Sequence, residues 1–128
     1  MCEGLMAEVL YKELSYQVIA AVFEVHNVLG PGFLERVYER ALDKELGMRK
    51  ISVETQKEIN VSYKGEVVGS YYADMLVEGK IIVELKAVEH LTRLHEAQLL
   101  NYLKATGIKL GLLVNMAGKS VEYKRLVY

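Results

Sequence analysis

The chain has 128 residues, of which 52% are hydrophobic and 26% are charged, and its formal net charge is -1 at pH 7. This composition predicts one globular domain over residues 1–128 and excludes a disordered chain, while the charge argues against nucleic-acid binding by bulk electrostatics alone. The single Cys2 allows no internal disulfide, and we find neither a membrane-spanning run nor a signal peptide. We therefore expect a cytoplasmic protein without membrane association, with residues 1–14 as an N-terminal extension.

Two helices are expected first in the chain. Apolar residues recur at helical spacing from Ser15 to Leu29, and Gly30-Pro31 stops this run. A second amphipathic helix is expected to start near Gly32 or Phe33 and to end near Gly47. Both helices therefore precede all of the predicted strands.

Strand-like runs make up most of the remaining chain. Alternating or continuous apolar residues, bounded by turn residues, predict these strands, and an N-cap at Thr92 followed by Gly107 predicts one more helix. The predicted strands span residues 58–63, 67–76, 81–88, 108–114 and 121–127. The order ααβββαββ indicates an α/β fold, in which the nearly all-apolar strand 108–114 is buried on both faces.

Charged side chains interrupt the apolar strand that follows Lys80. Glu84 and Lys86 are two residues apart, so in a strand they share one face. Together with Asp74, Glu84 offers the two carboxylates that hold a hard divalent cation, and Lys86 would steer or activate the attacking water. The alternative is a solvated strand face with a cross-strand Lys–Glu pair.

The length of the hairpin loop decides whether Asp74 can join Glu84. Even-numbered residues from Val68 to Leu76 share a side in a regular strand, so only an odd loop places Asp74 and Glu84 on one face. A three-residue loop, Val77-Glu78-Gly79, fits a type I turn with a bulge, in which Gly79 supplies the left-handed position. A two-residue Glu78-Gly79 turn is the alternative and would put the two acids on opposite faces.

Four short motifs, taken in order, resemble one known family. The segment Gly32-Phe33-Leu34-Glu35-Arg36-Val37-Tyr38 matches the signature of the GxxExxY proteins, which belong to the PD-(D/E)xK nuclease superfamily. The core motif of that superfamily has a proline before its first acid, and here Ala73 stands before Asp74. The other motifs are Asp74, Glu84-Leu85-Lys86 and Gln98-Leu99-Leu100-Asn101-Tyr102, the last being similar to the Gln-x-x-x-Tyr motif of the RecB-like branch. The resemblance covers about residues 15–127 and implies a restriction-endonuclease-like core, a mixed β-sheet flanked by helices.

The resemblance also implies a metal centre. Mg²⁺ or Mn²⁺ would be held by Asp74, Glu84 and the backbone carbonyl of Leu85, because oxygen ligands without cysteine pairs suit a hard metal. Lys86 would act on the water and the transition state, and Glu35 would complete the metal shell, through a second water. For Glu35 the alternative is a surface acid that the helix dipole stabilises.

Gln98, Tyr102 and His26 are the remaining candidates. Gln98 and Tyr102 are i, i+4 neighbours that would position a phosphate or orient Lys86; the alternative is a half-buried helix flank with the tyrosine packed on the core. His26 would be a further metal ligand, as in RecB-like nucleases, although a lone His such as His26 or His95 is more often a satisfied boundary residue.

We therefore expect a metal-dependent nuclease that hydrolyses phosphodiester bonds, with DNA favoured over RNA as its nucleic-acid partner. Its catalytic residues would be Lys86, Glu35, Gln98 and Tyr102. The alternative is a catalytically silent module of the same fold that binds nucleic acid or protein. The small size and near-neutral charge favour a homodimer or a partner protein.

Overall fold

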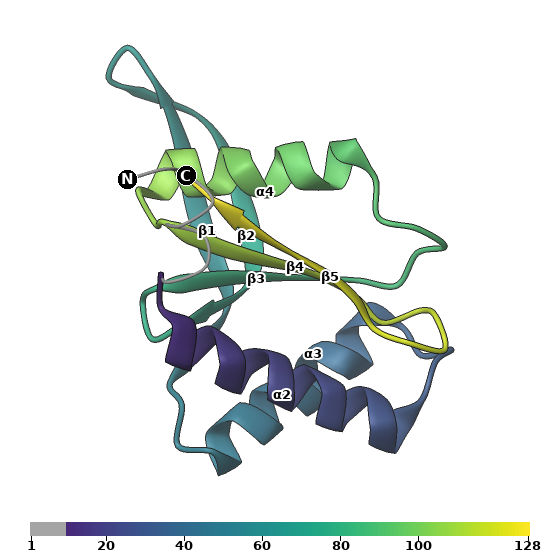
Figure 1. Cartoon of the computed structure of the whole chain (residues 1–128). Helices are drawn as coiled ribbons and strands as arrows, with labels where there is room; N and C mark the ends of the chain where they lie inside the picture. The colour runs from purple at the N-terminus through teal and green to yellow at the C-terminus, as the bar shows by residue number, and fades with distance from the viewer. Residues whose placement is uncertain (1–9) are drawn as a thin grey trace.

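The computed structural model describes residues 10–128, and the first nine residues lie outside this part of the chain. Helices and strands follow in the predicted order ααβββαββ, so the α/β prediction is confirmed (Figure 1). The elements are α2 (Lys12–Leu29), α3 (Glu35–Met48), β1 (Val53–Tyr63), β2 (Glu66–Val77), β3 (Ile81–Lys86), α4 (Arg93–Thr106), β4 (Leu110–Asn115) and β5 (Glu122–Val127).

All the described strands form one mixed sheet in the order β1-β2-β3-β4-β5. Strands β3 and β4 are parallel, and every other neighbouring pair is antiparallel. The parallel pair needs a crossover connection, which α4 provides on one face of the sheet. The sheet therefore matches the mixed sheet that the family resemblance implied.

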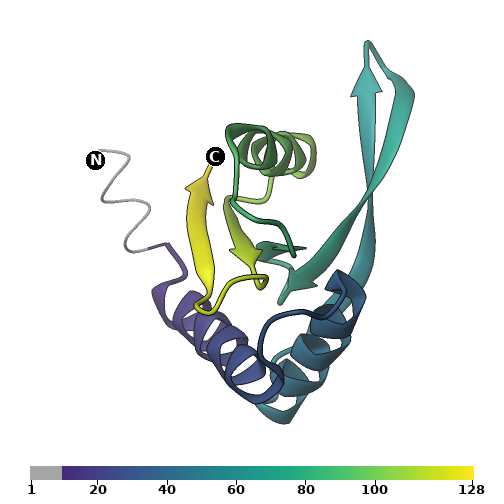
Figure 2. The same ribbon diagram turned by 90° about the vertical axis from the view of Figure 1, so that its right-hand side faces the viewer.

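Helices cover both faces of the sheet. Figure 2 shows α2 and α3 on one side and α4 on the other. Tyr38 and Leu42 of α3 share a core with Val83 and Leu85 of β3, whereas Leu99 of α4 belongs to a second core on the opposite face. Odd-numbered residues of β3 thus face α2 and α3, and the even-numbered side faces α4.

Tyr38 explains the structural part of the Gly-x-x-Glu-x-x-Tyr signature. Its side chain is fully buried, its hydroxyl donates to the carbonyl of Gly30 at 2.7 Å, and it accepts the Phe33 amide at 3.2 Å. Gly32 has a φ of 105°, which a residue with a side chain rarely adopts. The signature therefore closes the loop between α2 and α3 onto the core.

Several boundaries differ from the sequence prediction. The first helix begins at Lys12, inside the expected extension, and α3 begins at Glu35 because the closed loop occupies the preceding residues. The Thr92 cap and the terminal Gly107 of α4 are confirmed, and the hydroxyl of Thr92 accepts the His95 amide. No helix within residues 10–128 combines the length and apolarity needed to cross a membrane.

Strands β1 and β2 form an arm that extends beyond the rest of the sheet (Figures 1 and 2). They pair with each other over almost their whole length, but β2 pairs with β3 only from Met75 to Val77. The remainder of β2, up to the exposed tip at Lys64 and Gly65, therefore leaves the sheet together with β1.

Candidate active site

The loop between β2 and β3 has three residues, so the predicted odd length is confirmed. Val77 is paired with Ile81 and Leu76 with Ile82, which leaves Glu78, Gly79 and Lys80 as the loop. This is one residue later than predicted. The predicted left-handed conformation of Gly79 is confirmed by its φ of 65°. The type I turn itself is wrong at Glu78, because this residue has a positive φ of 53° where such a turn has a negative one.

Contacts with the chain before β1 accompany the unusual conformation of Glu78. Its amide donates to the carbonyl of Ser52 at 2.9 Å, and its carboxylate accepts the Ser52 amide at 2.8 Å. These two bonds help to hold a non-glycine residue in the left-handed region. The loop that sets the position of Asp74 against Glu84 is therefore fixed by the residue just before β1.

The side-chain alternation of β2 is broken at Asp74, so the prediction of a regular strand from Val68 to Leu76 is wrong. Ala73 and Leu76 both belong to the core under α4, whereas Met75 faces α2 and α3. Opposite this point Gln56 of β1 has a φ of 51° and drops out of the pairing register. Asp74 therefore lies at a bend where the arm departs from the sheet.

Asp74 and Glu84 are joined through the backbone at the point where β2 and β3 diverge. The amide of Asp74 donates to the Glu84 carboxylate at 3.0 Å, and the Asp74 carboxylate accepts the amide of Leu85 at 2.8 Å. Buried amides need partners, and here the two acids supply them where the backbone ladder has ended. Both carboxylates are thus fixed side by side.

The surroundings of Glu84 disfavour its charge. Burial, followed by the neighbouring Asp74 charge, raises the pKa of Glu84 to about 8, although the Asp74 amide and the charge of Lys86 act in the opposite direction. A divalent cation between the two carboxylates would remove their repulsion and favour the ionised form. The pair is therefore suited to a cation.

Lys86 ends β3 on the same side as Glu84. It is half-buried, and within the described residues it makes no ion pair of 4 Å or less. Its carbonyl accepts the Met116 amide at 2.8 Å. The side chain of Asn115 then bonds both backbone groups of Val88, at 3.1 and 2.8 Å, so the chain after Lys86 is fixed from β4.

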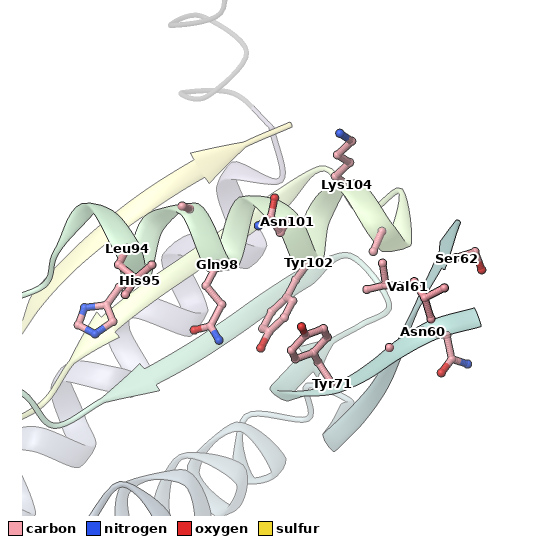
Figure 3. Close-up of a pocket in the computed structure, with 14 residues that line it drawn as sticks. Asn60, Val61, Ser62, Tyr71, Leu94, His95, Gln98, Asn101, Tyr102 and Lys104 are labelled. Atoms are coloured by element: carbon pink, nitrogen blue, oxygen red, sulfur yellow. The ribbon is translucent and has the colours of Figure 1, made fainter. Parts of the chain in front are cut away.

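Tyr102 of α4 lies near enough to the acidic pair to be affected by its charges. Burial, followed by the charges of Glu84 and Asp74, raises its pKa, so the hydroxyl stays protonated at neutral pH. Gln98 lies one helical turn earlier and is half-buried. In Figure 3 both side chains extend from the same side of α4, and the Tyr102 ring lies beside Tyr71 with 5.8 Å between ring centroids.

Glu35 and His26 are placed differently from the pair. Glu35 is the first residue of α3 and is exposed, and residues 10–128 contain no group of three or more His, Cys, Asp and Glu that could hold a metal ion. The structure therefore does not bring Glu35 to Asp74 and Glu84 as a direct ligand. His26 is buried, and its Nε2 donates to the Gly118 carbonyl at 2.8 Å.

Sequence analysis missed Gln56, which contacts Asp74, and Glu39, which contacts Gln56. Gln56 donates to the Asp74 carboxylate at 3.5 Å and to the Glu39 carboxylate at 2.9 Å, which connects α3 to the acidic pair through β1. Glu39 is one helical turn after Glu35. No motif marks Gln56, and its position depends on the bend that the structure shows in the arm.

Two acids and a lysine thus lie where two strands of the mixed sheet diverge, and sequence comparison shows the family of the chain. The profile described as the PD-(D/E)XK nuclease superfamily matches residues 12–126. The chain belongs to this superfamily, whose members generally use divalent metals and act on nucleic acid.

Comparison with solved structures supports the same fold. A structure described as "Crystal structure of SSO0001" aligns with a TM-score of 0.54 and 22% sequence identity. The alignment covers 96% of this chain and 60% of the other, so this chain spans well under the full length of that protein. No curated protein matches the sequence. This structural similarity therefore shows a shared fold and is not evidence for a shared function.

Proposed function

We propose that this protein is a metal-dependent nuclease that hydrolyses phosphodiester bonds, with DNA favoured over RNA, and that it belongs to the GxxExxY group near the RecB-like branch. The observation that carries this proposal is the pair of carboxylates, Asp74 and Glu84, fixed side by side through the two backbone bonds. Membership of the nuclease superfamily supports the same chemistry.

The donor atoms fit Mg²⁺ or Mn²⁺. Asp74, Glu84 and the Leu85 carbonyl offer oxygen, which hard cations prefer, and the described residues provide no third acidic or histidine ligand beside them. An ion that keeps several of its waters suits such a small set of ligands. When bound, the ion would neutralise charge on the phosphate and make water a better nucleophile. Glu35 would contribute through an intervening water.

Side chains of the protein would act on the phosphate together with the ion. The ammonium group of Lys86 has no carboxylate partner within the described residues and is available to stabilise charge that develops on the phosphate. The protonated Tyr102 hydroxyl and the Gln98 amide would donate hydrogen bonds to the phosphate or orient Lys86. A ligand role for His26 would require that it exchange its bond to the Gly118 carbonyl.

Cleavage assays test this function. Labelled single-stranded and duplex DNA are incubated with Mn²⁺ and wild-type protein, the Asp74→Ala variant or the Asp43→Ala variant. Asp43 is exposed on α3, so its replacement makes the same charge change away from the site. We expect cleavage by wild type and Asp43→Ala and none by Asp74→Ala. Equal cleavage by all three proteins would place the activity elsewhere.

A silent binding module is the second candidate, and the surface of the arm favours it. Tyr63 and Val67, near the tip of the arm, are 62% and 58% exposed, and exposed apolar side chains on a projecting ribbon are suited to a protein contact. A homodimer or a partner protein would use this surface, in a single-domain protein of the cytoplasm. DNA binding without cleavage under any metal condition would favour this candidate.

A further inference from the structure

A groove of about 880 Å³ lies between α4 and the β1–β2 arm, beside the acidic pair. Gln98 and Tyr102 line it from the helix, and Asn60 and Tyr71 line it from the arm (Figure 3). Tyr102 connects the groove to the proposed catalytic site, because it lines the groove and is also close enough to Glu84 and Asp74 for their charges to raise its pKa. A ligand in the groove would therefore be presented to the two carboxylates.

The lining of this groove is free of acid. Among its described lining residues none is Asp or Glu, although the chain contains 17 of them, and Lys104 and His95 are included. The remaining polar groups are amides and hydroxyls, which bond phosphate oxygens without repelling them. The groove is thus suited to an anionic chain in a protein whose net charge is close to zero.

Aromatic rings at the inner end add a second kind of contact. Tyr71 is 49% exposed, so part of its ring faces solvent even though its other side contacts Tyr102. An exposed ring beside a phosphate-binding surface is the platform on which an unpaired base stacks. The ring centroids of Tyr71 and Tyr102 are 5.8 Å apart, so helix and arm approach each other closely here, and an unpaired base needs less width than a base pair.

We propose that this groove binds a single-stranded segment of nucleic acid, with a base stacked on Tyr71 and the backbone running along α4 toward Asp74 and Glu84. The inference rests on the proposed nuclease function and names its substrate class. The opposite face of the arm differs, since Tyr72 points there and its hydroxyl donates to the Glu58 carboxylate at 3.2 Å. The two faces of one strand therefore provide a built-in comparison.

Binding is tested without catalysis, in EDTA, by fluorescence anisotropy of a labelled single-stranded oligonucleotide and of its duplex. We expect tighter binding of the single strand, a loss of about tenfold in affinity for Tyr71→Ala, and near-normal affinity for Tyr71→Phe. Tyr72→Ala is the matched control and should bind like wild type. Equal affinity of Tyr71→Ala and wild type, or tighter binding of the duplex, would contradict single-strand binding in the groove.

A charge substitution tests the groove without removing a packed ring. Asn101 lines the groove and is exposed, whereas Asn27 is exposed on α2, so Asn101→Asp and Asn27→Asp change the net charge equally at different places. We expect Asn101→Asp alone to weaken binding. Equal weakening by both variants would show bulk repulsion and would contradict a local site.

Cleavage measured on the same proteins separates this inference from the proposed function. If the protein binds a single strand in a Tyr71-dependent way but does not cleave it in Mn²⁺, single-strand binding in the groove is supported and the proposed nuclease activity is contradicted. If the protein cleaves in Mn²⁺ and Tyr71→Ala has the same rate and KM as wild type, the nuclease activity is supported and single-strand binding in the groove is contradicted.

Discussion

The Asp74 amide is bonded to the Glu84 carboxylate at 3.0 Å, immediately beyond the last backbone pair between β2 and β3. The Glu84 carboxylate thus accepts the hydrogen bond that a backbone carbonyl of the neighbouring strand would accept in a continuing sheet. This bond keeps the two acids together before any ion arrives, so the structure itself stabilises their close approach. It also means that stability and metal binding are coupled at this position.

Stability in the absence of metal should fall as the pH rises. The pKa of Glu84 is raised from 4.5 to about 8, so between these values the folded state holds a proton that the unfolded state has lost. The stabilising contribution is complete below the lower value and is lost as the pH rises through the upper one. Thermal unfolding of the protein in EDTA across this range measures the effect.

The Glu84→Gln variant isolates this contribution. Its amide oxygen can still accept the Asp74 amide, but it carries no charge. Near pH 8 in EDTA we expect this variant to be more stable than wild type, by on the order of 1–3 kcal/mol, and near pH 5 to be equal to it. Glu35→Gln, at an exposed acid, should show no such difference. A constant difference at every pH would mean that Glu84 does not carry this proton.

Metal binding and cleavage should separate in two variants. Lys86→Ala should abolish cleavage while Mn²⁺ affinity, measured by calorimetry, stays within about threefold of wild type, since Lys86 acts on the reacting groups. Asp74→Ala should abolish both. Lys109→Ala, at an exposed lysine before β4, serves as the control and should cleave normally. Normal cleavage by Lys86→Ala would assign the activity to another site.

Asn115 should stabilise the chain that follows Lys86. Replacing it with alanine leaves the half-buried amide and carbonyl of Val88 without this partner, which costs about 1 kcal/mol. We expect Asn115→Ala to lower the urea midpoint and to reduce kcat more than it changes KM, because Lys86 loses its fixed support. Asn101→Ala, at an exposed amide, should leave the urea midpoint unchanged.

Two glycines should respond to alanine in opposite directions. A Cβ at Gly111 of β4 would lie 2.9 Å from the side chain of Leu99, so Gly111→Ala should destabilise the protein by about 1–3 kcal/mol. A Cβ at Gly47 in α3 would meet nothing within 4 Å, so Gly47→Ala should stabilise it by about 0.5–1 kcal/mol. Chemical denaturation measures both; the same sign for both variants would contradict this packing of α4 on β4.

Local patterns were sufficient to predict the order of the elements and the odd loop between Asp74 and Glu84. They were insufficient where a strand is exposed or bent. Residues 53–57 are mostly polar and lie in an edge strand, so no apolar alternation marked the first half of β1. The bend at Asp74 depends on Gln56, a non-glycine residue with positive φ, and no residue type in the sequence marks such a position.

Tertiary contacts also decided where β3 stops and which acid of α3 communicates with the site. The strand was expected to reach Val88 but ends at Lys86, because the Asn115 side chain takes the bonds that a neighbouring strand would make. Gln56 bonds both the Glu39 and the Asp74 carboxylates, so Glu39 is linked to the site through it. These hydrogen bonds join α3, β1 and β2, which are separate elements of the sequence. Helical periodicity alone does not distinguish Glu39 from Glu35.

The exposed tip of the arm divides the protein into two chemically unequal halves. A break between Lys64 and Gly65 would leave α2, α3 and β1 on one fragment, and Asp74, Glu84, Lys86 and all of α4 on the other. Loop tips of this kind tolerate chain cleavage well. Since β1 and β2 pair along nearly their whole length, the fragments have a long interface through which to reassociate. The fold is therefore a natural candidate for a split reporter, silent until its two pieces are brought together.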